Sequence, residues 1–198
     1  MVLLYGAGGH AKVVLDALNE KGIQVRGFVD DTLKENQFLG VPVLGAYDPL
    51  ANQQDKFIIT IGDNSIRKAL ANKVTHSFDS IVSSSAVVSP LAKIGDGAMV
   101  LQGVIVQSET VISHHVILNT GCRVDHDCVV GAFSHIAPGA ILCGRVSVGE
   151  GTLVGAGSVV IPGIRIGNWC TIGAGSVIVR DIPDGAVVAG NPSRQLNK

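Results

Sequence analysis

The residue best suited to chemistry in this sequence is a histidine flanked by two acids, in the segment Val124-Asp125-His126-Asp127-Cys128. A carboxylate beside an imidazole can hold the ring in one tautomer and stabilise its protonated form. A histidine arranged in this way can act as a general base that removes a proton from an attacking amine or hydroxyl. An isolated histidine is more often a solvated turn residue, so the assignment of His126 as a base depends on the elements around it.

The element around His126 is a six-residue repeat. An aliphatic residue returns at every sixth position in the series Val82, Val88, Ile94, Val100, Val106, Ile112, Leu118, Val124, Val130, Ile136, Leu142, Val148, Val154, Val160, Ile166, Ile172 and Ile178. A period of six fits one short strand followed by one corner, and three such units close a triangular coil of 18 residues. Stacked coils pair as parallel strands about 4.8 Å apart. The repeat therefore predicts a parallel β-helix over about half of the chain, without a long protruding loop.

The 18-residue coil places glycines near the histidine and along one corner. Gly144 follows His126 by 18 residues and is therefore expected to stack directly over it. A glycine there leaves room for a thioester, and its N–H could stabilise the oxyanion that develops during acyl transfer. Gly155 and Gly173 are also 18 residues apart, on a shared corner that could guide the pantetheine arm of a coenzyme A thioester. These positions are compatible with acyl transfer from a thioester to an amine or a hydroxyl.

The first part of the chain, residues 1–80, has a different pattern. The expected strands are Val2–Tyr5, Val25–Val29 and Phe57–Ile61, and the expected helices are Ala11–Glu20 and a segment through Arg67 and Ala71. This βαβ-type order is typical of a parallel sheet with helices packed against it. It predicts a Rossmann-like α/β domain at residues 1–80, in front of the β-helix domain at residues 81–198.

The loop after the first strand, Gly6-Ala7-Gly8-Gly9-His10-Ala11, matches the fingerprint G-x-G-x-x-[GA]. Glycines at these positions let the backbone approach a phosphate at the N-terminus of the following helix. Asp30 or Asp31 could accept a hydrogen bond from a ribose hydroxyl. NAD is one possible ligand, but 80 residues are about half of a dinucleotide-binding domain, so a mononucleotide or a nucleoside diphosphate fits better. The alternative is a glycine turn that serves only the packing of the sheet.

The spacing of histidines and cysteines does not favour a metal site. The histidines are His10, His76, His114, His115, His126 and His135, and the cysteines are Cys122, Cys128, Cys143 and Cys170. No two histidines are five residues apart, and no CxxC or Cys-His ligand spacing is present. Three of the cysteines fall at the small inward position of the repeat, which predicts buried thiols. His114 and His115 lie at another corner without an acid neighbour, so we expect them at the surface or in an interface.

The composition argues against several other function classes. The chain of 198 residues has a formal net charge of −1 and no basic run, so we expect no nucleic-acid partner. No apolar stretch reaches the ~18 residues of a membrane-spanning helix. The N-terminal residues lack the basic region and the cleavage site of a signal peptide, which favours a cytoplasmic location.

Several segments together resemble the NeuD/PglD family of bacterial sialic acid O-acetyltransferases and nucleotide-activated amino-sugar N-acetyltransferases. They are the opening Leu-Tyr-Gly-Ala-Gly-Gly-His-Ala, then Phe-Val-Asp-Asp, Ile-Gly-Asp-Asn-Ser-Ile-Arg-Lys, Val-Asp-His-Asp-Cys-Val-Val-Gly-Ala-Phe-Ser-His, and the closing Gly-Asn-Pro-Ser-Arg. The resemblance spans nearly the whole chain. It implies a left-handed coil, a homotrimer with active sites between neighbouring β-helices, and acetyl-CoA as the donor without a metal. It also implies that the front domain binds a nucleotide-sugar.

The resemblance implies a role for individual residues as well. His126 would be the general base, Asp127 its partner, and His135 would lie near the acetyl group. Gly144 would face the thioester carbonyl, so that together with the path at Gly155 and Gly173 the positions expected to bind acetyl-CoA are His135, Gly144, Gly155 and Gly173. Gly8, Gly9 and His10 would approach the diphosphate, and Asp30, Asp31, Asp63 and Arg67 would line the nucleotide end. PglD-like members carry glutamates on both sides of the histidine, whereas this chain carries the shorter aspartates.

The leading expectation is an enzyme that transfers acetyl from acetyl-CoA to the amino group of a UDP-linked 4-amino-4,6-dideoxy sugar, as in bacillosamine formation, for bacterial glycan biosynthesis. A sialic acid O-acetyltransferase and a GDP-amino-sugar N-acetyltransferase are the alternatives with the same fold. The nucleotide-binding loop favours a nucleotide-linked acceptor, because free sialic acid carries no diphosphate. A trimeric nucleotide-binding scaffold is the non-enzymatic alternative, and the pairing of His126 with Gly144 argues against it.

Overall fold

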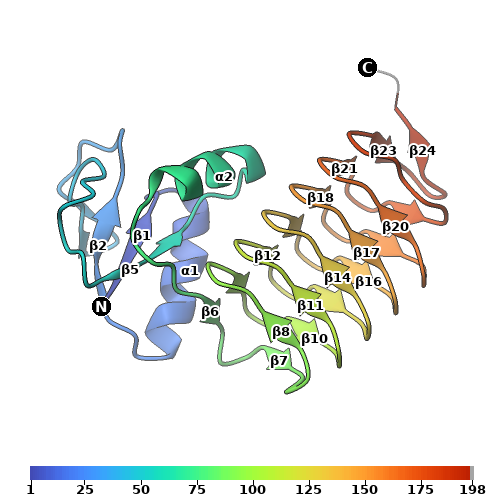
Figure 1. Ribbon diagram of the computed structural model, residues 1–198, viewed down its shortest axis with the longest axis horizontal. Helices are drawn as coiled ribbons and strands as arrows, with labels where there is room; N and C mark the ends of the chain where they lie inside the picture. The colour runs from blue at the N-terminus through green and yellow to red at the C-terminus, as the bar shows by residue number, and fades with distance from the viewer. Residues whose placement is uncertain (197–198) are drawn as a thin grey trace.

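The computed structural model describes residues 1–196 and joins a small α/β unit to a long β-solenoid (Figure 1). The α/β unit has three parallel strands in the order β2 (Val25–Val29), β1 (Val2–Tyr5) and β5 (Lys56–Ile59). Helix α1 (Gly9–Glu20) connects β1 to β2, and helix α2 (Asn64–Lys73) follows β5. A short hairpin of β3 (Gln37–Phe38) and β4 (Val41–Pro42), which the sequence pattern did not predict, lies between β2 and β5 in the chain.

Helix α1 packs between the small sheet and the solenoid because its apolar residues recur at helical spacing. Val14 and Leu18 are fully buried on this face. They share one hydrophobic cluster with Phe28 of β2 and with Met99 and Ile117 of the solenoid. The glycine loop that precedes α1 is thereby held at a fixed place beside the solenoid.

The solenoid is built from three sheets, which we call faces 1 to 3. Face 1 contains β6 (Ile81–Val82), β9 (Met99–Val100), β12 (Ile117–Leu118), β15 (His135–Ile136), β18 (Leu153–Val154), β21 (Thr171–Ile172), β23 (Val187–Ala189) and β24 (Arg194–Gln195). Face 2 contains β7 (Val87–Val88), β10 (Ile105–Val106), β13 (Arg123–Val124), β16 (Ile141–Leu142), β19 (Val159–Val160) and β22 (Val177–Ile178). Face 3 contains β8 (Lys93–Ile94), β11 (Val111–Ile112), β14 (Val129–Val130), β17 (Ser147–Val148) and β20 (Arg165–Ile166). The strands pair in parallel, except that β24 runs antiparallel to β23.

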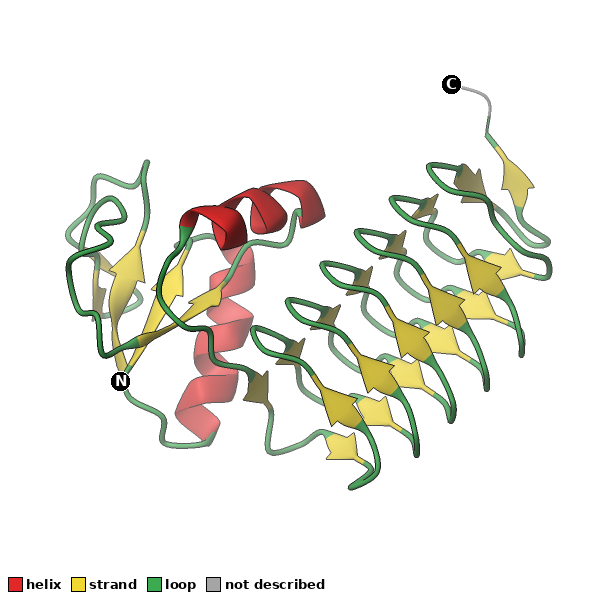
Figure 2. Cartoon of the chain, viewed as in Figure 1, coloured by secondary structure: helices red, strands yellow, loops and turns green. Residues whose placement is uncertain are grey.

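The solenoid core follows the aliphatic repeat. From β6 to β22 the strands recur without an insertion, so the expected absence of a long loop is confirmed (Figure 2). The register pairs Val124 with Leu142, the residue 18 positions later. The inward aliphatic residues of successive coils form one continuous cluster along the axis. Cys122, Cys128 and Cys170 belong to this cluster, as expected for small inward residues.

The three corners of the triangular coil carry different residues. The corner between faces 2 and 3, called corner 2–3, carries His126 directly after β13. Corner 1–2 carries Gly155 and Gly173, and corner 3–1 carries His115 and Trp169. In a triangular coil, corner 2–3 is the vertex opposite face 1. His115 is buried rather than at the surface, with 4% of its area exposed.

Candidate active site

His126 lies at corner 2–3 with its side chain about half exposed. Its Nδ1 is 2.7 Å from Oδ2 of Asp127. The other flanking acid, Asp125, accepts a hydrogen bond from the backbone N–H of His126 at 2.9 Å. Asp127 is therefore the flanking acid that holds the ring, and its bond at Nδ1 leaves Nε2 as the nitrogen that can take a proton.

Gly144 stacks over His126, as the 18-residue spacing predicted. A Cβ atom on Gly144 would lie 2.7 Å from both Cε1 and Nε2 of His126. The N–H of Arg145 donates to the carbonyl oxygen of His126 at 3.0 Å, which fixes the register of the two coils. The absence of a side chain at Gly144 thus provides the space that the imidazole occupies.

Gly155 and Gly173 stack one coil apart at corner 1–2, which is not the corner that carries Gly144. A Cβ on Gly155 would lie 2.5 Å from the carbonyl oxygen of Ile172 and 2.6 Å from the amide nitrogen of Ala174. Backbone atoms cannot move aside as a side chain can. The stacking of the corner therefore requires glycine at position 155, whatever ligand passes along it.

The glycine loop between β1 and α1 leaves the start of the helix open. Gly8 is the N-cap residue of α1, and its cap has no side-chain hydrogen bond. Gly8 and Gly9 are exposed, and a Cβ at either position would meet nothing within 4 Å. The free N–H groups and the positive end of the helix dipole face this open space, an arrangement that can bind phosphate oxygens.

Asp30 and Asp31 are both held by other groups of the protein. Asp30 accepts a hydrogen bond from the N–H of Ala7 at 2.9 Å and further bonds from the turn that follows it. Burial raises the pKa of Asp30, but these hydrogen bonds outweigh burial and keep the pKa below its ordinary value. The hydrogen bond from Lys73 is the main cause that lowers the pKa of Asp31, which also accepts from the hydroxyl of Tyr5 at 2.8 Å. Asp30 therefore shapes the glycine loop, and Asp31 is tied to the end of α2.

Arg67 is buried in the structure, although the resemblance implies a place for it at the nucleotide end. Its side chain is fully buried, and all three of its nitrogens donate to oxygens of the chain itself. Burial lowers the pKa of its guanidinium to about 10. Asp63 caps α2 by accepting from the N–H of Ile66 at 2.9 Å and the hydroxyl of Ser65 at 2.6 Å. Asp63, unlike Arg67, borders the cleft between the α/β unit and the solenoid.

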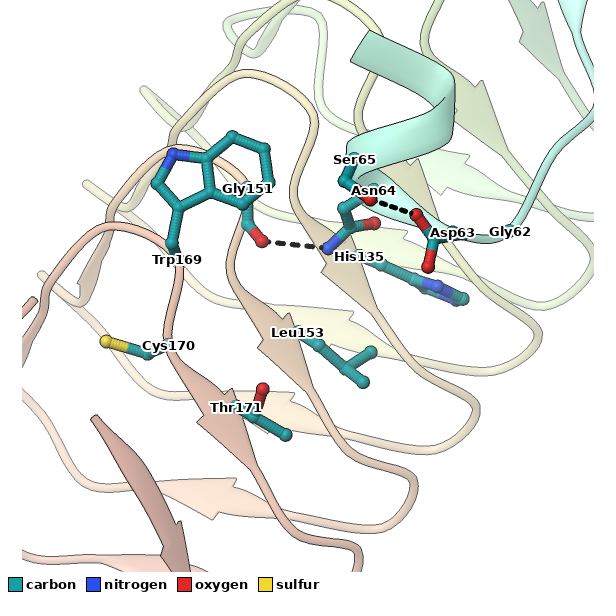
Figure 3. Close-up of a pocket in the computed structure, with 10 residues that line it drawn as sticks. All are labelled: Gly62, Asp63, Asn64, Ser65, His135, Gly151, Leu153, Trp169, Cys170 and Thr171. Carbon is teal, nitrogen blue, oxygen red and sulfur yellow. Dashed lines mark hydrogen bonds between the residues drawn. The ribbon is translucent and has the colours of Figure 1, made fainter. Parts of the chain in front are cut away.

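A cleft of about 360 Å³ lies between the start of α2 and the solenoid (Figure 3). Its lining residues are Gly62, Asp63, Asn64 and Ser65 from the α/β unit, His135, Leu153 and Thr171 from face 1, and Gly151, Trp169 and Cys170 from corner 3–1. The side-chain amide of Asn64 donates to the carbonyl oxygen of Gly151 at 3.0 Å. This bond joins the two walls of the cleft directly.

Two histidines meet beside the cleft, one from each part of the chain. The ring centroids of His10 and His135 are 6.2 Å apart. Burial is the main cause that lowers the pKa of both imidazoles to about 4, and the cation of Arg67 lowers them further. The amide of Asn119 donates to Nε2 of His135 at 3.0 Å, whereas Nε2 of His10 is buried without a partner among the described residues. Both rings are therefore neutral at pH 7 where the two parts of the chain meet, and His135 lines the cleft.

The predicted site residues do not all meet within one chain, and Gly155 and Gly173 lie at corner 1–2. Gly8, Gly9, His10, Asp63 and His135 lie on the side of face 1. His126, Asp127 and Gly144 lie at the opposite vertex. In residues 1–196, no group of three or more possible metal ligands is present, and no helix is long and apolar enough to cross a bilayer.

Sequence reasoning missed the part of the cleft made by Asn64 and Trp169. The 18-residue spacing carried a signal for Trp169, which follows Gly151 by one coil. A Cβ on Gly151 would lie 2.5 Å from the indole ring, so the glycine makes room for Trp169 as Gly144 does for His126. The role of Asn64 depends on how the two parts of the chain pack together, which local spacing does not encode.

Comparisons with known proteins agree with this architecture. Residues 1–74 match the family model described as the PglD N-terminal domain, and residues 145–180 match the bacterial transferase hexapeptide model of six repeats. The structure of PerB from Caulobacter crescentus, in complex with CoA and GDP-perosamine, is 40% identical, with a TM-score of 0.93 over 99% of this chain and 97% of that one. The acetyltransferase domain of PglB from Neisseria gonorrhoeae is 37% identical, with a TM-score of 0.94 over 98% of both chains.

Two curated relatives match over part of their length. The UDP-N-acetylbacillosamine N-acetyltransferase of Bacillus subtilis is 37% identical over 109 residues, which are 50% of each chain. An uncharacterized protein of Acanthamoeba polyphaga mimivirus is 34% identical over 98 residues, and this chain spans 20% of its length. The likeness to PerB and to the acetyltransferase domain of PglB, over nearly all of both solved chains, confirms the expected fold, a Rossmann-like α/β unit followed by a left-handed parallel β-helix. The chain therefore belongs to the NeuD/PglD family of hexapeptide-repeat sugar acetyltransferases.

Proposed function

We propose that this enzyme transfers acetyl from acetyl-CoA to the amino group of a nucleotide-activated amino-sugar in the cytoplasm. The observation that carries the proposal is the imidazole of His126, held by Asp127 at Nδ1 and lying against Gly144. In this reaction the amine nitrogen attacks the thioester carbonyl and gives its proton to Nε2 of His126. The C–S bond then breaks, and the CoA thiolate receives a proton, so the imidazole returns to its neutral form. Such a base typically contributes about 10²–10⁴-fold to the rate.

The acceptor end of the proposed site is the α/β unit, residues 1–80. Its support is the open N-terminus of α1, where the N–H groups near Gly8 and Gly9 can hold a diphosphate. A sugar attached to that diphosphate would extend past His10 and His135 into the cleft. There His135 would contact the acetyl group or its acceptor through a neutral ring.

The donor end is the β-helix, residues 81–198, where acetyl-CoA would contact Gly144 at corner 2–3 and Gly155 and Gly173 at corner 1–2. The structural neighbour PerB was solved with CoA and GDP-perosamine, and the PglB domain was solved with acetyl coenzyme A, which supports this donor. No metal takes part in the proposed reaction.

The nucleotide of the acceptor is either UDP or GDP. Our first choice is a UDP-linked 4-amino-4,6-dideoxy sugar, supported by the likeness to the UDP-N-acetylbacillosamine N-acetyltransferase. The likeness to PerB, which was solved with GDP-perosamine, supports the GDP-linked alternative. The test is thiol release from acetyl-CoA with UDP-linked and GDP-linked amino-sugars, and with sialic acid as the hydroxyl acceptor. Thiol release without N-acetylation of any nucleotide-sugar would refute the proposal, and no release at all would favour the scaffold.

We also propose that the active enzyme is a homotrimer, because His126 lies at the vertex opposite the face that carries His135. The base of one chain would then serve the cleft of its neighbour. Light scattering should give about three times 20.5 kDa. Coexpression of two inactive variants, His126→Ala and Gly9→Asp, should restore about a quarter of wild-type activity in randomly mixed trimers. An active monomer, or no recovery in mixed trimers that contain both chains, would overturn the shared site.

A further inference from the structure

Arg67 lies where the α/β unit meets the solenoid, and its guanidinium bonds to both. On the side of the α/β unit it donates to the carbonyl oxygens of Ile61 (3.0 Å), Gly62 (3.2 Å) and Asp63 (3.3 Å) and to Oδ1 of Asn64 (2.8 Å). On the side of the solenoid it donates to the carbonyl oxygens of His115 (2.9 Å), Phe133 (2.7 Å) and Ser134 (3.4 Å). The side chain has 0% of its area exposed. One residue thus joins the two parts of the chain through seven hydrogen bonds.

The geometry of these bonds is specific to arginine. Nη1 donates only to the α/β unit, Nε donates only to the solenoid, and Nη2 bridges Asn64 and Phe133. A planar fork of fixed donors can satisfy acceptors in these three directions, whereas a lysine ammonium is a compact charge with three donors. A buried cation without hydrogen-bond partners lowers the stability of the folded protein. A shift of the α/β unit relative to the solenoid would break some of these bonds, so Arg67 favours the arrangement seen in the structure.

The segment that Arg67 holds is also a wall of the cleft. Three of its acceptors belong to Gly62 and Asp63 in the loop after β5 and to Asn64 at the start of α2, and all three residues line the cleft. Asn64 accepts from Nη2 of Arg67 and donates to Gly151 across the cleft. The opposite wall carries His135, so the position of Arg67 sets the distance between the loop and this histidine.

We propose that Arg67 is a positioning residue for the acetyl acceptor. Arg67 holds residues 62–64 against the solenoid, so that the cleft has the width that the sugar requires. This inference rests on the proposed function of the same cleft. Its cation also disfavours a second positive charge nearby, which helps to keep His10 and His135 neutral. A misplacement of about 1 Å in such a site can cost 10²-fold in rate.

The test compares Arg67→Lys and Arg67→Gln with the control Arg26→Gln. Arg26 is a second arginine whose side chain bonds within the protein, to the buried Asp55, but it lies on the edge strand β2 of the small sheet, away from the cleft. We expect both Arg67 variants to raise KM for the nucleotide-sugar by about tenfold or more and to lower kcat, with KM for acetyl-CoA unchanged, as for a misplaced binding group. Arg26→Gln should lower the melting temperature and leave both KM values unchanged.

A second readout does not depend on activity. Trp169 is the one tryptophan of the sequence and lines the cleft next to Asn64, so its fluorescence reports on the separation of the two walls. We expect acrylamide to quench Trp169 more strongly in the Arg67 variants than in the wild type and in Arg26→Gln. If the Arg67 variants do not fold, Asn64→Ala replaces them, because it removes the acceptor of Nη2 and the bond to Gly151.

The outcomes separate this inference from the proposed function. A wild-type enzyme that acetylates no nucleotide-sugar would refute the proposed function, and the quenching of Trp169 would still test whether Arg67 locks the cleft. Variants that lose thermal stability but keep the wild-type sugar KM and the wild-type quenching would overturn the positioning role. A rise in KM for acetyl-CoA of the same size as that for the sugar would overturn it as well.

Discussion

Replacing Gly144 with alanine tests the geometry around His126 directly. The new Cβ would lie 2.7 Å from Cε1 and Nε2 of His126, and because ordinary contacts begin near 3.4 Å, the ring must move by about 0.7 Å or more. The backbone of Gly144 is outside the left-handed region, so alanine fits its conformation. The imidazole is half exposed and can move toward solvent. We therefore expect the free energy of unfolding to change by no more than about 0.5 kcal/mol.

The catalytic cost of Gly144→Ala should be much larger than its cost in stability. Displacement of a catalytic group by about 1 Å can lower the rate 10²-fold. We expect kcat to fall by about 10- to 100-fold, or about 1.4–2.7 kcal/mol of barrier. KM for both substrates should stay within about twofold, since uniform binding is retained. The assay is thiol release at saturating acetyl-CoA and nucleotide-sugar, with a thermal melt of the same sample.

The matched control is the double variant that combines His126→Ala with Gly144→Ala. In His126→Ala the imidazole is gone, so the added Cβ of Gly144→Ala has nothing left to displace and should cause no further loss of kcat. Equal fold-losses in the wild-type and His126→Ala backgrounds would refute the reasoning. So would a raised KM for acetyl-CoA at unchanged kcat, because the Cβ would then block the donor instead of the base.

Three further predictions concern single residues. His126→Ala should lower kcat by about 10²–10⁴-fold. Asp127→Asn should lower kcat by less, because it weakens the orientation of the ring but leaves the base in place, and a side-by-side measurement of kcat for the two variants checks this. Gly155→Ala should lower the free energy of unfolding by about 1–3 kcal/mol, measured by urea titration, since its Cβ would meet backbone atoms at 2.5 Å. Burial lowers the pKa of His115 to about 4 in the folded protein. Below pH ~6.5 the unfolded chain therefore binds a proton at His115 that the folded protein does not bind. The free energy of unfolding should fall as the pH is lowered from about 6.5 to 4, by up to about 1.4 kcal/mol per pH unit. His115→Asn should reduce that slope in urea titrations between pH 7 and 5.

The repeat predicted the solenoid closely because its signal is local and redundant. Each inward residue, such as Val124, stacks on the residue 18 positions later, so one period determines strand, corner and register at once. The glycine loop and α1 were predicted for a similar reason, since turn chemistry and helical spacing act over a few residues. The hairpin of β3 and β4 was missed because two-residue strands at Gln37–Phe38 and Val41–Pro42 carry too few residues for a period.

Sequence spacing predicted some contacts of the candidate site and not others. The contact between His126 and Gly144 follows from the coil period and was predicted correctly. The resemblance implied a place for Arg67 at the nucleotide end, whereas in the structure its guanidinium donates to Asn64 and to main-chain carbonyl oxygens from two parts of the chain. Asp30 or Asp31 was expected to accept from a ribose hydroxyl, and in the structure the carboxylate of Asp30 already accepts a hydrogen bond from the N–H of Ala7. Sequence spacing shows which residues are present, but only the packing shows which of their polar groups are already used.

The coil period also explains why two histidines that are close in sequence cannot act together within one chain. Residues that differ by 18 stack on each other, as Gly144 does on His126. His135 follows His126 by nine residues, half a coil, which places it on the face opposite that vertex. Between them lies the closely packed core that contains Val124 and Leu142, so no ligand can pass. A base at position 126 can therefore reach an acceptor held near His135 only when that acceptor lies on another copy of the chain, and the triangular coil itself makes the proposed active site depend on assembly.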